Sequence, residues 1–224
     1  MRTLTFKTLL CSAILGVVGC ASTQVDPSHY SGFLKDYSRL KADESVSGAP
    51  VMRWIDPDIK LDKYTQVYIE PSQLYPKPQP TAVISAQTLQ SITRYYDTAL
   101  KRELGKNMRL AEGPGANTIT VRPAITAVST STERLKAYEV IPVALVAAAV
   151  NTAAGGRDQS VEIATEAAFL DAATNEVLAQ VVRKGSGKSL ENDKAQLTLD
   201  DVKPVLDGWA SDMRLTYEKF KTGK

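Results

Sequence analysis

Residues 161–170 read VEIATEAAFL, residues 171–176 read DAATNE and residues 177–184 read VLAQVVRK. The first and third stretches are rich in apolar and β-branched residues, whereas four of the six residues between them are polar. Asn175 is the residue in that link best able to adopt a left-handed backbone. The pattern predicts two strands joined by a turn.

Further strands and helices are expected on either side of this pair. Two amphipathic helices are indicated by apolar residues three and four apart, one over Ser85–Leu104 with Gly105 as its C-cap and one from Asp201 to Phe220 with Pro204 in its first turn. Pro123 cannot donate a backbone hydrogen bond, so its strand should be bulged or at an edge there. The other expected strands are Val51–Ile55, Thr65–Glu70 and Asn117–Val128.

The remaining segments are interpreted more simply. In Tyr30–Leu40, three apolar side chains recur at helical spacing. Three polar stretches indicate loops: Lys41–Pro50, Ser129–Glu133 and Gly185–Lys194. The predicted fold is therefore a single α+β domain, in which two amphipathic helices cover an antiparallel sheet of about four to five strands, with a short Ala-rich apolar helix in addition.

The N-terminus has the organisation of a secretory signal. Arg2 and Lys7 precede an apolar run of about eleven residues, which is too short to span a bilayer about 30 Å thick. The run closes on Val17-Val18-Gly19-Cys20, which resembles the bacterial lipobox. That resemblance implies cleavage between Gly19 and Cys20, with diacylglycerol on the Cys20 thiol and an acyl chain on the new amine.

Removal of this signal changes the chemistry of the chain. The whole sequence has 27 basic and 25 acidic residues, and loss of Arg2 and Lys7 balances the two at 25 each. No electrostatic attraction to nucleic acid is expected from a neutral chain. Cys11 leaves with the signal and Cys20 carries lipid, so neither a disulfide nor a cysteine metal site is expected.

The predicted organisation has three parts: a signal peptide over residues 1–19, a lipidated tether over 20–29 and one periplasm-facing domain over 30–224. Several acyl chains make a stable anchor, whereas one binds only marginally. Ala21, rather than an aspartate, follows Cys20. By the sorting rule for such lipoproteins, that residue favours the outer membrane.

Three stretches resemble a family of bacterial lipoproteins known as a domain of unknown function, family 3313. They are Ser31–Leu40, Tyr64–Pro71 and Glu162–Leu178. The family's last stretch usually reads Asp-x-x-Thr-Gly-Glu-Val-Leu, and Asn175 here occupies the place where glycine is commoner. The resemblance extends from about Tyr30 to Phe220. It implies a cell-envelope lipoprotein and supplies no catalytic residues.

Motifs that would carry catalysis are incomplete. Gly185-Ser186-Gly187-Lys188-Ser189 lacks the first glycine of a phosphate-binding loop, because Val182 stands there. His29 is the only histidine and has no neighbouring ligand pattern, so we expect an exposed residue and no metal site. Glu162 and Glu166 share one strand face about 13 Å apart, beyond the usual spacing of paired catalytic carboxylates. We interpret them as a solvated strand face.

Two features favour contacts with a partner. Tyr95 points away from the core face of its predicted helix, where an exposed tyrosine could contact a glycan or a protein, but a partly buried, hydrogen-bonded phenol is the interpretation we favour. Val140–Ala154 is almost wholly apolar, with alanines at the four-residue spacing that allows close helix approach: Ala144, Ala148, Ala149 and Ala153. This helix should pack within the monomer, against another subunit or at the membrane surface.

These observations lead to a functional hypothesis. We expect a non-catalytic, outer-membrane-anchored lipoprotein that acts as an interaction or assembly module, through a protein partner or self-association. It should need no cofactor beyond the lipid on Cys20, and neither metal nor nucleic acid. The alternative is a periplasmic hydrolase that acts on glycan or lipid through carboxylates.

Overall fold

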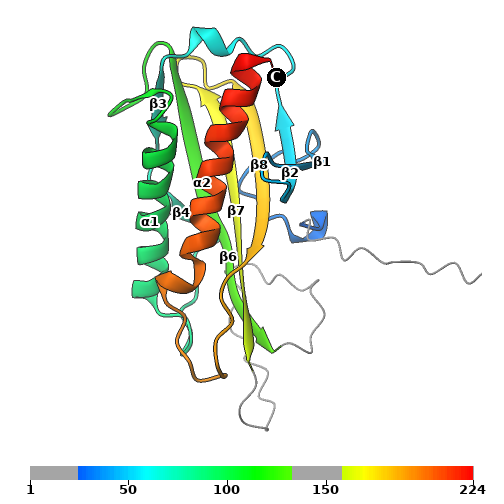
Figure 1. The fold of residues 1–224 in the computed structure, drawn as a ribbon, viewed down its shortest axis with the longest axis vertical. Coiled ribbons are helices and arrows are strands. Elements are labelled where there is room, and N and C mark those ends of the chain that lie inside the picture. The colour runs from blue at the N-terminus through cyan, green and yellow to red at the C-terminus, as the bar shows by residue number, and fades with distance from the viewer. Residues whose placement is uncertain (1–24, 133–157, 224) are drawn as a thin grey trace, which may run out of the picture.

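The computed structural model describes residues 25–132 and 158–223. The described chain forms one eight-stranded sheet with two long helices side by side on one face (Figure 1). The elements in chain order are η1 (Pro27–His29), β1 (Lys41–Glu44), β2 (Pro50–Ile55), η2 (Leu61–Lys63), β3 (Gln66–Ile69), β4 (Gln73–Leu74), α1 (Ala86–Leu104), β5 (Arg109–Leu110), β6 (Thr118–Thr132), β7 (Gln159–Asp171), β8 (Val177–Ser186) and α2 (Leu199–Thr222).

The strand order is β1-β2-β8-β7-β6-β3-β5, with β4 paired to β6 beyond the end of β3. The four pairs from β1 to β6 are antiparallel, but β3 runs parallel to both β5 and β6. The α+β class is confirmed, whereas an antiparallel sheet of four to five strands is wrong. Parallel pairing arises because α1 carries the chain from β3 back to β6, as a crossover helix does.

The central pair of strands, β7 and β8, is confirmed, as is the left-handed backbone of Asn175, with φ of 60°. β6 and β8 both run further than expected, to Thr132 and Ser186, through stretches whose polar residues had indicated loops. Both extensions pair with β7, so the long antiparallel ladder outweighs the low apolar content of these ends. The segment Lys41–Pro50 likewise contains β1 instead of being a loop throughout.

Pro123 sits at an interruption in the pairing of β6. On the edge of β6 away from β7, β3 pairs with residues up to Val121, and the pairing with β4 starts at Ala124. The carbonyl groups of Val121 and Ile125 accept hydrogen bonds from Glu70 and Tyr75 on that side, so the amide position of Pro123 faces the gap between the two short strands. The absence of an amide donor at Pro123 therefore breaks no hydrogen bond of the ladder. Pro123 lies at an edge-like position, as the sequence predicts.

Both long helices are confirmed. α1 begins after Ser85, whose hydroxyl accepts from the Thr88 amide, and ends at Gly105. α2 begins two residues earlier than expected, after a capping box formed by Thr198 and Asp201. Pro204 therefore lies in the second turn instead of the first.

The sheet has a core on each face. The larger one lies between the sheet and the two helices, and includes the fully buried Ile92, Tyr96 and Leu206. On the opposite face, the segment Val25–Leu40 covers Ala168, Leu170 and Val182. We call this segment the N-terminal strap.

The strap is not helical apart from the single turn of η1, so the helical spacing seen in Tyr30–Leu40 was misleading. Gly32 and Lys35 both have positive φ, at 90° and 64°, which breaks a helix. The Tyr37 hydroxyl accepts from the amides of Gly32 and Leu34, at 2.8 and 3.2 Å, in place of helical carbonyl groups. The predicted Ala-rich helix over Val140–Ala154 lies outside the described residues.

Candidate functional site

Glu166 fastens the N-terminal strap to the sheet. Its side chain projects from β7 on the face opposite the helices and is 1% exposed. One carboxylate oxygen accepts from the Ser31 amide at 2.9 Å, and the other accepts from the Tyr37 hydroxyl at 2.6 Å. The expectation of a solvated carboxylate at this position was wrong, because the strap, which was expected elsewhere as a helix, covers it.

Aromatic side chains of the strap shield this carboxylate. Tyr30 stacks on Tyr37 with ring centroids 4.4 Å apart. Burial, followed by the hydrogen bond to Glu166, raises the pKa of Tyr37 to about 12, so its hydroxyl remains a donor at neutral pH. The Arg39 guanidinium lies 3.7 Å from the centre of the Trp54 ring on β2, which adds a second attachment further along the strap.

Val25 is the first described residue and is already buried, at 6% exposure, in the core beneath the strap. It falls within the expected tether over residues 20–29, so the end of that tether already contributes a buried side chain to the domain. Val25 is five Cα–Cα steps along the chain from Cys20, a reach of at most about 18 Å. Gly19 and Cys20 themselves lie outside the described residues.

The second carboxylate of the expected pair, Glu162, has a different neighbour. It lies on the same face of β7 and forms an ion pair with Lys184 of β8 at 3.0 Å. Each of the two glutamates is thus held by its own set of partners, and no local sequence pattern predicts either set.

Tyr95 is half-buried between the two helices. Its hydroxyl donates to the Asp207 carboxylate at 2.7 Å, and the Lys203 ammonium lies 5.2 Å from its ring centre. The structure thus shows the hydrogen-bonded phenol that the sequence allowed. A role for Tyr95 in contacting a partner stays a prediction, as do those of Ala144, Ala148, Ala149 and Ala153, which lie outside the described residues.

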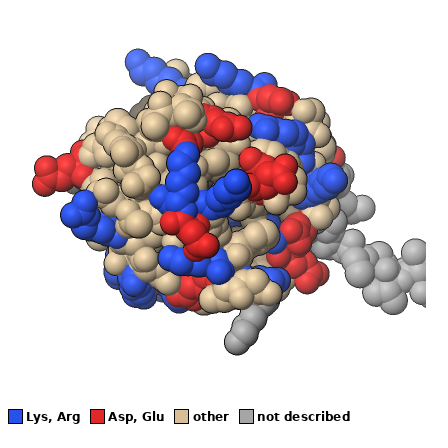
Figure 2. All heavy atoms as spheres, turned by 90° about the horizontal axis from the view of Figure 1, so that it is seen from above, with Lys and Arg blue, Asp and Glu red and all other residues tan. Residues whose placement is uncertain are grey.

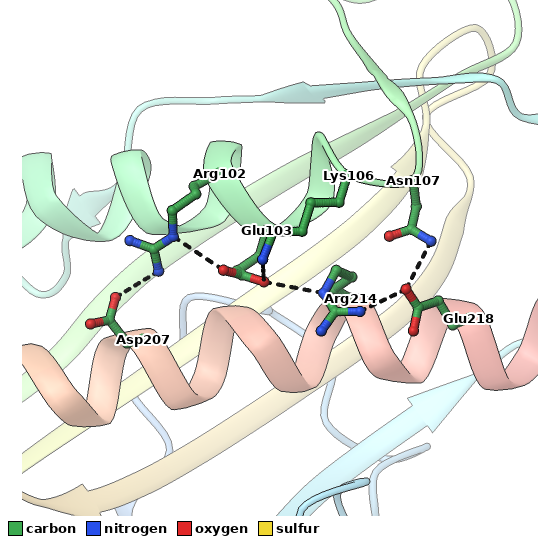
Figure 3. A network of polar contacts seen from close by, with 7 residues as sticks. All are labelled: Arg102, Glu103, Lys106, Asn107, Asp207, Arg214 and Glu218. Atoms are coloured by element: carbon green, nitrogen blue, oxygen red, sulfur yellow. Dashed lines mark hydrogen bonds and ion pairs between the residues drawn. The ribbon is translucent and has the colours of Figure 1, made fainter.

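A charged network joins α1 to α2 (Figure 3). The Glu103 carboxylate, 7% exposed as a residue, contacts Lys106 at 2.7 Å and both Arg102 and Arg214 at 3.1 Å. Arg102 continues to Asp207 at 2.8 Å, and Arg214 to Glu218 at 2.6 Å. These cations lower the pKa of Glu103 to about 2, and the hydrogen bond from Lys106 contributes most to this shift.

A buried ion pair lies between the sheet and α2. Arg183 of β8 and Asp212 of α2 are each 3% exposed at the side chain, and their closest atoms are 2.9 Å apart. Asp212 also accepts from the amide and the hydroxyl of Ser47, at 3.2 and 3.0 Å. This ion pair links the β1–β2 loop, β8 and α2. No residue spacing in the sequence predicts it.

The motifs that the sequence analysis set aside have structural roles. Gly185 lies at the end of β8 against α2, and the Lys188 amide donates to the Asp201 carbonyl, so this stretch is packed against a helix start rather than curled around an anion site. Among the described residues, no three His, Cys, Asp or Glu side chains gather as a metal site would require. No helix in that part of the chain is long and apolar enough to cross a membrane.

A protein family described as "Protein of unknown function (DUF3313)" matches residues 29–213. The chain belongs to this family. It is 38% identical to the uncharacterized lipoprotein YdcL of Escherichia coli strain K12 over 213 residues, which cover 95% of this chain and 96% of the relative. The same identity and coverage are found with YdcL of Escherichia coli O157:H7. The family resemblance noted in the sequence is thereby confirmed.

Solved structures with a similar arrangement are more distant. PelC from Paraburkholderia phytofirmans, crystallised as a dodecamer, is 10% identical with a TM-score of 0.39, over 72% of this chain and 96% of that one. A neuraminyllactose-binding hemagglutinin homologue from Helicobacter pylori is 10% identical with a TM-score of 0.40, over 75% and 95%. Similarity at this level supports no inference about function.

Proposed function

We propose that this member of the family is a lipoprotein of the outer membrane, anchored by acyl chains on Cys20, whose periplasmic domain acts by binding a partner and not by catalysis. The observation that carries the proposal is the short distance along the chain between the lipobox cysteine and the buried residue Val25. Val25 packs on the sheet and lies within about 18 Å of Cys20. The relatives from Escherichia coli, named as uncharacterized lipoproteins, support the lipoprotein part of the proposal.

The environment of the two glutamates supports a binding role over carboxylate hydrolysis. A general acid and base must reach one bond from two sides, with their carboxyl groups roughly 5–9.5 Å apart. Glu166 is 1% exposed and accepts hydrogen bonds from the strap, while Glu162 is paired with Lys184. Both carboxylates are thus engaged within the fold.

The partner we propose is a protein, either a second copy of this chain or another envelope component. The Ala-rich segment Val140–Ala154 is the proposed contact, because its small side chains permit close approach of another helix. Chemical crosslinking in intact envelopes, with Cys20 present, is the direct way to capture such a partner.

The anchor is tested by Cys20→Ser. We expect the variant to remain unprocessed, or to be cut elsewhere and released, because the thiol that receives diacylglycerol is gone. The measurement is fractionation of cells with mass analysis of the purified protein. Cys11→Ser is the matched control, since it changes the only other cysteine and should leave the acylated mature form in the outer membrane. A mature, acylated Cys20→Ser protein in that fraction contradicts the proposal.

A further inference from the structure

An apolar cavity of about 90 Å³ lies between the sheet and the C-terminal half of α2. Val67, Val121 and Phe169 line it from the sheet, and Met213 and Tyr217 line it from α2. Its volume is well above the roughly 10–15 Å³ that one water molecule needs, and its walls are mostly apolar, with Arg53, Arg183 and Thr216 among the polar members of the lining. Such cavities take apolar ligands.

The cavity opens to the surface at one end of the molecule. Ile55, Ile59, Leu61 and Phe220 line both the cavity and a wider surface groove beside it. Phe220 is 46% exposed, which is unusual for so large an apolar side chain. The cavity and the groove thus share a mostly apolar rim, to which Arg53 also contributes.

The groove around this opening carries more positive than negative side chains. Five of its lining residues are basic and three are acidic: Lys41, Arg53, Lys60, Lys63 and Lys221 against Asp43, Asp56 and Asp62. Figure 2, which views this end of the molecule, shows Lys and Arg side chains interspersed with Asp and Glu.

Ion pairs already use part of that positive charge. Arg53 pairs with Asp43 and Lys63 with Asp171, each at 2.6 Å. Lys41, Lys60 and Lys221 are exposed and form no ion pair with any residue that the structure describes. Lys221 instead donates to the hydroxyl of Tyr217, a residue that lines the cavity. Lys60 and Lys221 directly neighbour Ile59 and Phe220 in the chain, which line both the cavity and the groove, so these two lysines are the cations best placed to meet an anion at the opening.

We propose that this cavity and groove bind a single-chain amphiphile with an anionic head group, a carboxylate or a phosphate. The end of the alkyl chain occupies the cavity, and the head group lies in the groove beside Lys60 and Lys221. Apolar walls supply affinity for the chain, and the unpaired cations supply selectivity for the charge. The proposal rests on the described residues alone and does not depend on the lipid anchor.

The test is photolabelling with dodecanoic acid that carries a diazirine near the end of its chain. The full-length protein, with Cys20 intact, is reconstituted in phosphatidylcholine vesicles, labelled, and mapped by mass spectrometry. We expect label on the cavity walls, such as Met213 and Tyr217, and competition by unlabelled dodecanoate or dodecyl phosphate. The stronger of these two competitors identifies the head group, and dodecanol should compete several-fold less well.

Two pairs of variants sharpen the test. Ala179→Leu adds bulk to the cavity wall and should weaken labelling by about tenfold or more, whereas Ala195→Leu, outside the cavity, should not. Lys60→Gln with Lys221→Gln should remove the preference for dodecanoate over dodecanol. Lys188→Gln with Lys194→Gln, also exposed, is the matched control.

Three results would overturn the proposal. The label could map outside the cavity, a folded Ala179→Leu protein could be labelled as strongly as the unchanged protein, or dodecanol could compete as well as dodecanoate. If Ala179→Leu does not fold, the proposal is still tested by the site of labelling and by the competition measured on the variant with Lys60→Gln and Lys221→Gln.

Discussion

Glu103 holds α1 and α2 together through three cations, two from its own helix region and one from the facing helix. These contacts lower the pKa of Glu103 to about 2, so its carboxylate is more stable in the folded chain than in the unfolded one. A group of this kind stabilises the fold above its ordinary pKa. That contribution is lost as the pH falls towards the folded pKa.

We therefore expect Glu103→Gln to lower the free energy of unfolding by about 1 kcal/mol at pH 7, because the cations lose their shared anion while still contacting water. The deficit should shrink as the pH falls from 4.5 to 2, where the native carboxylate also becomes protonated. Urea unfolding across that range measures it. Glu191→Gln, at an exposed position, is the control and should change little at either pH.

At the scale of single residues, local motifs can be predicted from the sequence, whereas contacts between distant residues cannot. The prediction for Cys20 rests on four adjacent residues, because the lipobox is local. The contacts of Glu166 cannot be predicted in this way, since its partners Ser31 and Tyr37 are more than a hundred residues away and reach it only after the strap has folded over β7. The same holds for Asp212, whose partners come from two other parts of the chain.

At the scale of elements, the long helices and strands carry the clearest sequence signal. α1, α2, β7 and β8 each have ten or more residues, enough for a full pattern of apolar spacing, and all four were predicted. β1, β4 and β5 have two to four residues, and their pairing depends on a neighbouring strand that is already in place. The parallel pairing of β3 is likewise set by the crossover through α1, which no local pattern records.

Packing of α2 on β8 is tested at Gly185. A methyl group added there would lie 2.6 Å from Val205 Cγ1 and 3.1 Å from Trp209 Cζ2, so these side chains, or α2 with them, would have to shift. We expect Gly185→Ala to lower the free energy of unfolding by about 1–3 kcal/mol, measured by urea unfolding.

Gly208→Ala is the matched control for that substitution. Gly208 is an exposed residue inside α2 with no atom within 4 Å of the added methyl group. Alanine is the better helix former, so this variant should gain about 0.5–1 kcal/mol. If Gly185→Ala were as stable as the unchanged protein, the close approach of β8 and α2 would not be rigid.

At the scale of the whole molecule, the strap determines how far the domain stands from Cys20. With the strap in place, the buried residue Val25 lies about 18 Å or less along the chain from the cysteine. If the strap were released as far as Leu40, about twenty residues would separate Cys20 from the sheet, with a reach of up to about 70 Å. The hydrogen bonds of Glu166 oppose that release.

Glu166→Ala removes the acceptor of the Ser31 amide and the Tyr37 hydroxyl and leaves two donors without a partner when the strap is closed. An unpaired buried donor costs about 1–3 kcal/mol, so the strap should open more often while the helices and β6–β8 stay folded. Hydrogen exchange on the vesicle-bound protein measures this. We expect amides within Val25–Leu40 to exchange roughly ten- to a hundredfold faster and those of α1 to be unchanged.

Glu162→Ala is the control, because it makes the same substitution on the same strand face but removes a partner of Lys184 instead of the strap. Exchange in Val25–Leu40 should then match the unchanged protein. If Glu166→Ala also left that exchange unchanged, the apolar contacts of Val25, Leu34 and Leu40 would hold the strap without the carboxylate. If exchange rose throughout the molecule, Glu166 would stabilise the whole fold, and the strap would not open separately from the rest of the domain.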